Sequence, residues 1–504
     1  RHWENVATIQ EEMGNKDEAI ESYKKALYYD RTNYDVRKKL NMLQNKPDLY
    51  KLLPEVEPYA IIRQAPINKE YNFTYLIDEK AAIIYEEGAS EEYTTYAVKL
   101  DTEKGIDTWK EIYLSYSYST QDLLVEKAEV VKANGSKVTA ERDDDHVVFP
   151  GLEVGDAIYV KYRVQNYSRG RLGREFYDQF TMNSFVPSRH ARYTLVAPKD
   201  YKFNWHLTNS DLQPATKPAG EYKVYTWELK DVAALKSEPL MPNLNDVGVV
   251  LHISSIKSWS DVAQWYSDLS YQDLRDNVEL NNLYAEIFPD DKKMSNLEKA
   301  RKIYDYIVTN IRYSSVDFRQ SGLVPQEISK IISTRLGDCK DMSMLYVALA
   351  KMAGIPAQLV LIDTRDNGTK DMILPTMGFN HCIAMAKIDG KDYYIELTDS
   401  KLPFGSLGNN LTGALSLLVP NHGEKANAEL KPLQAPAKTP DRSIRNINVT
   451  VTGKDIRLNV VTKRYGSLTS GWREDYSTLP PEKQREEYEQ TISNGYKNPV
   501  KLES

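Results

Sequence analysis

Cys339 occupies a position where a cysteine could act as a nucleophile. It is one of two cysteines among 504 residues and lies in the segment 335–341, which reads RLGDCKD. Apolar residues then recur at i, i+3 and i+4 spacing from Met342 to Ala353, which predicts a helix with Asp338 as its N-cap. Because the N-terminal end of a helix carries partial positive charge and unpaired N–H groups, it favours a thiolate over a thiol. A free cysteine is more often a small core residue, so the interpretation depends on a partner base.

A histidine that could be this base follows in a predicted β-hairpin. His381 lies near the start of the first strand, the second strand covers Asp392–Asp399, and Asp389-Gly390 forms the turn. A two-residue loop would place His381 opposite Thr398, whereas one extra bulge residue would place it opposite Asp399. We predict the bulged register, because it puts a carboxylate beside the imidazole, where it can fix the tautomer.

The order Cys339, His381, Asp399 fits nucleophilic acyl transfer. The imidazole would accept the thiol proton, the carboxylate would orient the imidazole, and the thiolate would attack a carbonyl carbon. The backbone N–H of Cys339 would be one donor of an oxyanion hole, and Tyr313 is a candidate for the second. Tyr313 could equally be a tyrosine that ends an amphipathic helix.

Together these residues resemble a known family. The stretch from Trp259 to Val419 resembles a bacterial transglutaminase-like domain, of the papain-like superfamily that includes transglutaminases, arylamine N-acetyltransferases and microbial cysteine peptidases. The resemblance implies a core of N-terminal helices and an antiparallel sheet, a triad on Cys339, His381 and Asp399, and no cofactor or metal. The matching pieces are GDCKD at 337–341, AKMAGIPA at 350–357, Asn380-His381 and LTD at 397–399.

Details of the spacing favour this branch over papain itself. The histidine follows the cysteine by 381 − 339 = 42 residues, against about 130 or more in papain-type proteases. Many family members have an aromatic residue soon after the histidine, whereas this chain has Cys382-Ile383, which leaves the substrate open. Because neighbouring side chains of a strand point to opposite faces, we expect Cys382 to face away from Cys339, into the core, with no disulfide between them.

The remaining sequence predicts a multidomain α+β protein. Residues 1–50 resemble a tetratricopeptide-like helical repeat, a unit that buries its apolar face against neighbouring repeats and could bind a protein partner. Residues 57–250 alternate in short strands typical of a β-sandwich and resemble the uncharacterised β domain that commonly precedes transglutaminase-like domains. The transglutaminase-like domain is expected at 251–420, a proline-containing linker at 421–443, and a β-hairpin and helix, forming an incomplete domain, at 444–504.

Composition excludes several classes of protein. A net charge of −7 argues against a general nucleic-acid binder. No apolar run approaches the ~18 residues that a membrane-spanning helix needs. The cluster Asp143-Asp144-Asp145-His146 could hold a hard cation, but it lacks the spaced oxygen ligands of a calcium loop, so we interpret it as a solvated turn. The chain begins Arg1-His2-Trp3 without a leader sequence, so we expect its natural start to lie upstream.

Three functions compete on these observations. We favour hydrolysis of peptides or other amides through an acyl-enzyme at Cys339; release to an amine instead of water would make the protein a transglutaminase. A non-catalytic scaffold or binding module of the cell envelope is the second hypothesis. A metal hydrolase is the third and is disfavoured, because the chain has no His-Glu-x-x-His or paired Cys-x-x-Cys pattern. The resemblance implies a bacterial, extracytoplasmic location.

Overall fold

The structure of the chain is a computed structural model. The residues that it describes form two compact units. These residues are 1–168, 170–272, 274–275, 277–290, 293–314, 322–435, 437–453, 455–495 and 501–503. The first unit comprises Arg1–Trp265 with Asn367–Met377, and the second comprises Tyr266–Asp366 with Gly378–Ser504. The five-part division predicted above is finer than these two units and stays a prediction.

Helices begin the first unit and strands make up most of the rest. Its helices are α1 His2–Glu12, α2 Lys16–Tyr29, α3 Tyr34–Leu43, η1 Leu49–Leu52, α4 Pro58–Gln64, α5 Glu103–Trp109 and α6 Leu244–Val247. Its strands are β1 Phe73–Ile84, β2 Ser90–Leu100, β3 Glu111–Tyr113, β4 Gln121–Val131, β5 Lys137–Thr139, β6 Glu141–Asp143, β7 His146–Val148, β8 Ala157–Asn166, β9 Tyr177–Thr181, β10 Ser188–Pro198, β11 Asn204–Leu207, β12 Ala215–Ala219, β13 Tyr222–Val232 and β14 Val250–Ser254.

The second unit alternates helices with a smaller antiparallel sheet. Helix α7 Trp259–Ser270 crosses the division between the units, and the later helices are α8 Val278–Ile287, α9 Asn296–Asn310, α10 Ile328–Thr334, α11 Cys339–Met352, η2 Arg365–Asn367, η3 Gly466–Thr469, α12 Ser470–Ser477 and α13 Pro481–Ser493. The strands are β15 Arg312–Tyr313, β16 Leu336–Gly337, β17 Ala357–Asp363, β18 His381–Ile388, β19 Lys391–Ile395, β20 Leu415–Leu418, β21 Lys431–Pro432, β22 Arg442–Thr452 and β23 Asp455–Tyr465.

The N-terminal helices share a small core of their own. Helices α1, α2 and α3 meet around buried Ala7, Tyr23, Leu27 and Val36, and Trp3 packs against this cluster. The alternation of small and large apolar residues along these helices is what lets them approach one another. The tetratricopeptide assignment of this segment stays a prediction.

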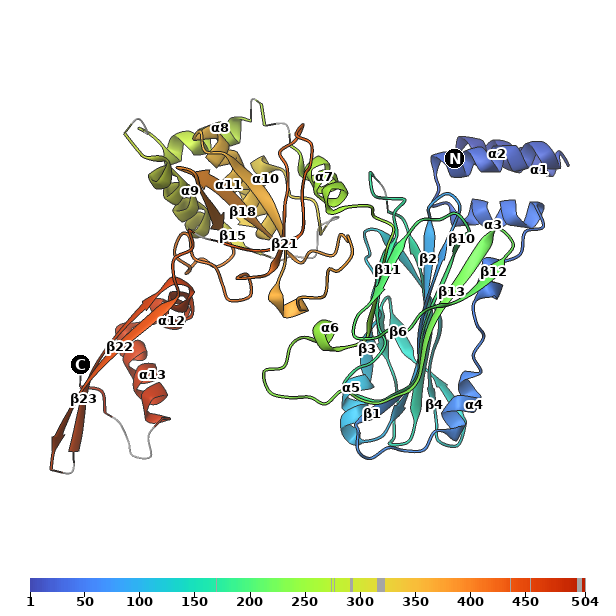
Figure 1. Cartoon of the computed structure of the whole chain (residues 1–504), viewed down its shortest axis with the longest axis horizontal. Helices are drawn as coiled ribbons and strands as arrows, with labels where there is room; N and C mark the ends of the chain where they lie inside the picture. The colour runs from blue at the N-terminus through green and yellow to red at the C-terminus, as the bar shows by residue number, and fades with distance from the viewer. Residues whose placement is uncertain are drawn as a thin grey trace. The chain divides into compact units, whose positions relative to one another are not determined.

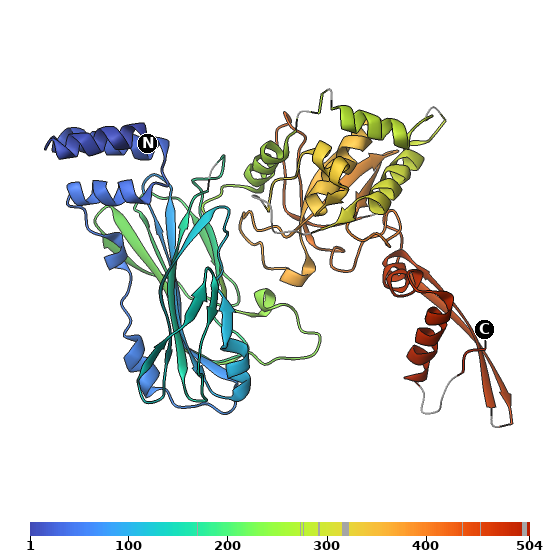
Figure 2. The ribbon, with the colours of Figure 1, turned by 180° about the vertical axis from the view of Figure 1, so that it is seen from behind.

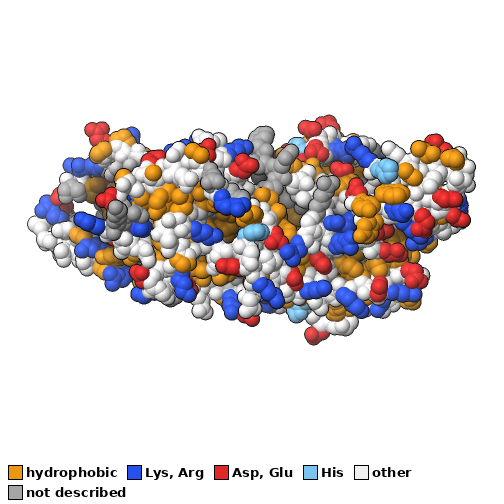
Figure 3. All heavy atoms as spheres, turned by 90° about the horizontal axis from the view of Figure 1, so that it is seen from above, with side chains coloured by type: hydrophobic (Ala, Val, Ile, Leu, Met, Phe, Trp, Pro, Cys, Tyr) orange, Lys and Arg blue, Asp and Glu red, His pale blue; other side chains and the backbone are white. Residues whose placement is uncertain are grey.

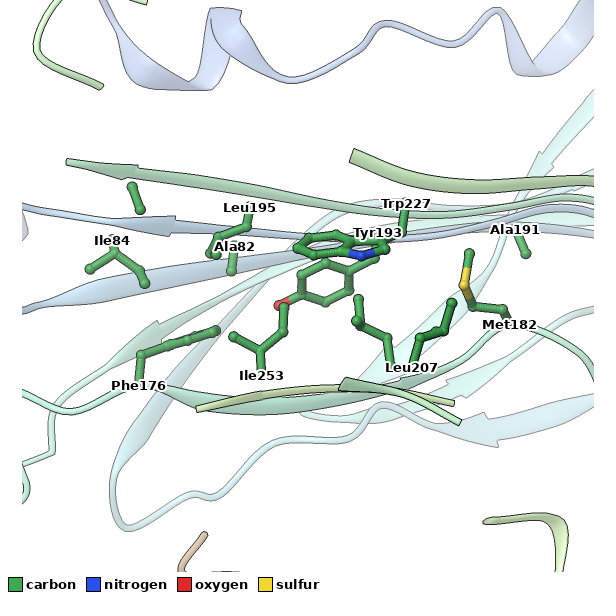
Figure 4. Close-up of a cluster of buried hydrophobic side chains, with 12 residues drawn as sticks. Ala82, Ile84, Phe176, Met182, Ala191, Tyr193, Leu195, Leu207, Trp227 and Ile253 are labelled. Carbon is green, nitrogen blue, oxygen red and sulfur yellow. The ribbon is translucent and has the colours of Figure 1, made fainter. Parts of the chain in front are cut away.

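The strands of the first unit form the expected sandwich. A large sheet, in the order β12-β13-β10-β1-β2-β8-β4-β5, is covered by the smaller sheets β11-β14-β9 and β3-β7-β6. Trp227 and Tyr193, both fully buried, lie at the centre of the core between the large sheet and β11-β14-β9 (Figure 4). A second core gathers around Val98, Ile158 and Val160. The α+β class predicted from the sequence is confirmed.

A buried ion cluster lies between these two apolar cores. Lys80 Nζ on β1 contacts Asp178 Oδ1 at 2.5 Å and Glu92 Oε2 at 2.9 Å, and its side chain is 20% exposed. The Tyr193 hydroxyl donates to Asp178 Oδ2 at 2.6 Å. The neighbouring carboxylates outweigh burial, which acts in the opposite direction, and so raise the pKa of Lys80. The ammonium therefore neutralises two carboxylates that water hardly reaches.

Loss of this ammonium is expected to destabilise the sandwich. Lys80→Met leaves two carboxylates buried without a counter-ion, which typically costs about 3 kcal/mol of unfolding free energy. Lys230→Met is the matched control, because the Lys230 side chain is 67% exposed and its ion pair with Glu228, at 3.5 Å, is open to water. This substitution should change the free energy of unfolding by about 0.5 kcal/mol or less. Urea unfolding followed by tryptophan fluorescence measures both, and equal losses would contradict the account.

The sheet of the second unit carries the helix that contains Cys339. Its strands run in the order β19-β18-β17-β20-β21, and α11 packs on β17 and β18 while α9 packs on α11 (Figures 1 and 2). Apolar residues on both faces of the sheet are buried, including Leu361, Ile362 and Ile383. This arrangement agrees with the helix-plus-antiparallel-sheet core expected above.

The C-terminal segment contains the predicted hairpin and helix. Strands β22 and β23 pair in antiparallel register from Arg442 with Tyr465 to Thr452 with Asp455. Lys454, expected in the turn with Gly453, lies outside the described residues. Helix α13 covers the predicted segment from Pro481 to Ser493.

Surface and hydropathy add two findings. Among the described residues, no helix combines the length and apolar character needed to cross a bilayer. Basic and acidic side chains are interspersed over the face shown in Figure 3.

Candidate functional site

Helix α11 holds Cys339 at its first position, as predicted. Asp338 is the N-cap: its Oδ1 accepts from the Asp341 N–H at 3.2 Å, and Asp341 Oδ2 accepts from the Asp338 N–H at 3.2 Å. Asp341 is fully buried and also accepts from the backbone and side-chain N–H groups of Gln326, at 2.8 and 2.7 Å. This capping box fixes the end of the helix in place. Cys339 itself is partly exposed, as a nucleophile must be.

His381 is the first residue of β18, and the hairpin that follows has the shorter loop. Ile388 pairs with Lys391 and Ala384 pairs with Ile395. The predicted bulged register is therefore wrong. Asp389 and Gly390 both adopt positive φ, +49° and +78°, as a two-residue primed turn requires, and such a turn leaves no room for an extra residue.

The register changes which carboxylate meets the histidine. Glu396 Oε2 lies 2.8 Å from His381 Nε2, and the side chains are 7% and 15% exposed. Asp399, predicted for this role, accepts instead from the Ser470 hydroxyl, and from the Lys401 N–H at 2.9 Å. In the observed register Glu396 is the diagonal cross-strand neighbour of His381, on the same face of the sheet. The sequence interpretation missed Glu396; reading Asp-Gly as a two-residue turn would have found it.

The two ring nitrogens of His381 have different partners. Because Nε2 is held by Glu396, Nδ1 is the nitrogen left for the hydrogen bond with the Cys339 side chain. Burial acts to lower the pKa of His381, but the hydrogen bonds with Cys339 and Glu396 outweigh it and raise the pKa to about 10. The imidazole is thus held as an imidazolium at neutral pH, between a sulfur and a carboxylate.

Glu396 is equipped to remain ionised in a buried position. Its Oε1 accepts from the Thr398 N–H and from the Thr398 hydroxyl, both at 2.7 Å. Burial acts to raise the pKa of Glu396, yet the His381 and Thr398 hydrogen bonds leave it lower than usual. Every oxygen of this carboxylate therefore has a donor, which satisfies the condition for burying a charge.

A side-chain clamp sets the start of β18. The Asn380 amide donates to Thr364 Oγ1 at 2.8 Å, and Asn380 Oδ1 accepts from the Thr364 N–H at 3.0 Å. These bonds close the base of the connection between β17 and β18. They position the backbone one residue before His381.

Tyr313 lies beside the cysteine rather than at the end of a helix. It belongs to β15, where it pairs with Gly337, and its side chain is 43% exposed. Burial first, and then the charges of Cys339 and Asp338, raise the pKa of the Tyr313 hydroxyl, which therefore stays protonated and able to donate. The N–H of Cys339, at the first helical position, has no carbonyl within the helix to bond to. The predicted oxyanion donors are thus on the same side of the site, and their role stays a prediction.

Cys382 is buried in the core, and Cys339 and Cys382 are both free thiols. The expected place of Cys382 in the core is confirmed, and the expectation that it faces away from Cys339 stays a prediction. Burial raises the pKa of the Cys382 thiol, and the charges of Cys339 and Asp338 raise it further. The Cys382 sulfur also hydrogen-bonds Tyr266. Helix α11 packs directly on β18, where the Ser343 hydroxyl donates to the Cys382 carbonyl at 3.2 Å.

A metal centre finds no support in the described part of the chain. Within it, no group of three or more histidine, cysteine, aspartate or glutamate side chains is arranged to hold a metal ion. Asp144 and Asp145 form the turn between β6 and β7, with Asp143 paired to His146, as the solvated-turn interpretation predicted.

Two regions of the chain match known families. Residues 86–236 match a domain of unknown function, DUF3857, and residues 285–396 match the transglutaminase-like superfamily. The chain contains a transglutaminase-like domain. The matched residues of this domain include Cys339, His381 and Glu396, whereas Asp399 lies beyond them.

One solved structure supports this fold. A crystal structure of a proposed protease from Parabacteroides distasonis aligns with a TM-score of 0.59 and 14% identity, over 82% of this chain and 97% of that one. A proposed cysteine protease from Cytophaga hutchinsonii aligns with a TM-score of 0.21 and 12% identity, over 57% of this chain and 85% of that one. A protein described as a TGase aligns with a TM-score of 0.19 and 11% identity, over 41% of this chain and 51% of that one. At 14% identity the likeness to the Parabacteroides distasonis protein concerns the fold alone, and the two lower TM-scores support no conclusion. The curated proteins contain no match.

The choice between Glu396 and Asp399 can be tested on the thiol. Without the Glu396 carboxylate the His381 pKa should fall, so fewer imidazolium–thiolate pairs form in acid. Alkylation of Cys339 by iodoacetamide at pH 6 should be at least about tenfold slower in Glu396→Gln, and within about twofold of the unaltered chain in Asp399→Asn. Peptide mapping by mass spectrometry measures the rates. Slowing by Asp399→Asn alone would restore the original assignment.

The pKa of His381 also predicts how stability depends on pH. Folding raises the pKa of His381 from 6.5 to about 10, so the protonated ring stabilises the folded state. This contribution to the free energy of unfolding is complete below pH 6.5 and is lost as the pH rises through 10. The difference in unfolding free energy between the chain and His381→Gln should therefore shrink by on the order of 4 kcal/mol across this range. Urea titrations at pH 6, 8 and 10 measure it; a difference that grows with pH would contradict the assignment.

Proposed function

We propose that the transglutaminase-like domain catalyses thiol-dependent acyl transfer from peptide or other amide substrates, with water as the acceptor. The observation that carries this proposal is His381, held by Glu396 Oε2 at 2.8 Å through Nε2 and hydrogen-bonded to the Cys339 side chain. A nucleophile, a base and a group that orients the base are thus in contact. In this proposal Cys339, His381 and Glu396 are the triad.

The reaction starts from a thiolate and an imidazolium. The Cys339 sulfur attacks the amide carbonyl carbon, forming a C–S bond, and the carbonyl electrons move to oxygen. The Cys339 N–H, with Tyr313 as second donor, stabilises this oxyanion. The intermediate collapses as the C–N bond breaks, and the imidazolium gives its proton to the departing amine. A thioester and a neutral imidazole remain.

Water completes the cycle. Imidazole accepts a proton from a water molecule whose oxygen attacks the thioester carbon, and the C–S bond then breaks to return the thiolate. The carboxylic acid leaves, and the imidazolium is restored. Glu396 stays ionised throughout and keeps the ring oriented, as its lowered pKa and its bonds from Thr398 favour. Hydrolysis is favoured over transfer to an amine because water reaches a site unless the fold excludes it.

Activity on a peptide mixture tests the proposal. The protein is incubated with a proteome-derived peptide pool, in the presence and absence of a labelled primary amine. Cleavage should produce new peptide termini, and their formation should require Cys339. Cys339→Ala should abolish them, with a loss of at least about a thousandfold. Cys382→Ala is the matched control and should retain activity. Amine incorporation exceeding hydrolysis would make the enzyme a transglutaminase.

A result without products also has a defined meaning. The enzymatic proposal is wrong if two results are found together. The chain forms no products, and Cys339 reacts with iodoacetamide no faster in the unaltered chain than in His381→Ala. The scaffold hypothesis then becomes the better account of this domain.

A further inference from the structure

A cavity of about 490 Å³ lies next to the triad and within the same unit. This volume is within the range of about 300–1,000 Å³ that is typical of ligand pockets. Tyr313, Leu336, Met342 and Thr398 are among the residues that line it. None of these residues belongs to the triad.

The lining residues connect the cavity to the reacting atoms. Leu336 and Met342 each lie three residues from Cys339 along the chain, before and after it. Tyr313 is close enough to Cys339 for the charge of the sulfur to act on its hydroxyl. Thr398 donates to Glu396 as well as lining the cavity. The residues that line the cavity therefore include neighbours of both Cys339 and Glu396.

The charged side chains among the described residues that line the cavity are all basic. Arg312 and Arg335 line it, and no aspartate or glutamate is among its described lining residues. In the described part of the chain neither arginine forms an ion pair. The Arg335 guanidinium donates to the Tyr306 hydroxyl, which in turn donates to Glu286 Oε1 at 3.2 Å. Arg335 thus contacts Glu286 only through the Tyr306 hydroxyl, and Arg312 is exposed with no carboxylate partner among the described residues.

The backbone holds the two arginines next to each other. The Arg312 N–H donates to the Arg335 carbonyl at 2.8 Å, where β15 runs beside β16. Arg335 is the C-cap of α10 with φ +55° and ψ +27°, a left-handed conformation that usually selects glycine or asparagine. A side chain kept at such a position, at a cost of roughly 1 kcal/mol, is consistent with a function for its guanidinium.

We propose that this cavity is a substrate subsite for a carboxylate of an acidic peptide, bound by Arg312 and Arg335 next to the scissile amide. The inference rests on the proposed function, since it assumes that substrates reach Cys339. Guanidinium groups bind carboxylates through paired N–H donors, and the threonine, serine and asparagine side chains around the cavity can complete the contacts. The carboxylate comes from an aspartate or glutamate side chain or from a chain terminus.

Protection of Cys339 from alkylation tests the subsite without requiring turnover. Alanine tetrapeptides carrying one glutamate or one glutamine, at each position in turn and with an acid or amide C-terminus, compete with iodoacetamide. The best acidic peptide should protect at least about tenfold better than its glutamine amide counterpart, and less so at high salt. The glutamate amide and glutamine acid peptides distinguish a side-chain carboxylate from a terminal one.

Variants assign the effect to the arginines. Arg312→Gln should reduce the preference for acidic peptides to about twofold or less, while Arg312→Lys, which keeps the charge, should retain part of it. Lys330→Gln is the matched control, because Lys330 is exposed and does not line the cavity; it should leave the preference unchanged. Three results would overturn the subsite. In the first, acidic and neutral peptides protect Cys339 equally; in the second, neither protects it; in the third, the preference for acidic peptides survives Arg312→Gln.

The outcomes separate this inference from the proposed function. Loss of the acid preference with a Cys339 that still cleaves peptides refutes the subsite alone. A Cys339 whose alkylation does not depend on His381 refutes the enzyme, whatever the peptides do.

Discussion

The hydrogen bond between His381 and Glu396 is the constraint on which the site depends. It brings a charged pair to a position where the side chains are 15% and 7% exposed, and such a pair is tolerated only if each partner's remaining polar atoms are also satisfied. Thr398 supplies this for Glu396, and the Cys339 side chain supplies it for the second nitrogen of the ring. The imidazolium can therefore not rotate without leaving a buried charge unpaired.

Two pieces of local structure bring these groups together. The capping box of Asp338 and Asp341 fixes the start of α11, so the sulfur is presented from a defined helical turn. The short loop at Asp389-Gly390 fixes the register of the hairpin, so Glu396 faces the same side of the sheet as His381. A slip of one residue would move the carboxylate to the opposite face. The chemistry thus depends on a cap and a turn rather than on the larger sandwich.

Much of this could be predicted from the sequence, and the errors have a common origin. Helix α11 with its N-cap, the strands on either side of Asp389-Gly390 and helix α13 follow from periodicity, caps and turn residues, which are local signals. The prediction of Asp399 follows from the bulged register, which would put this carboxylate beside the histidine, although Asp-Gly itself favours the two-residue turn.

The protonation of His381 is the most direct test of the central interaction. Nuclear magnetic resonance of the imidazole, assigned among the seven histidines with His381→Gln, reports its charge at each pH. The account predicts that His381 remains an imidazolium through neutral pH and titrates near 10. A midpoint close to the ordinary histidine value of about 6.5, unchanged in Glu396→Gln, would contradict it.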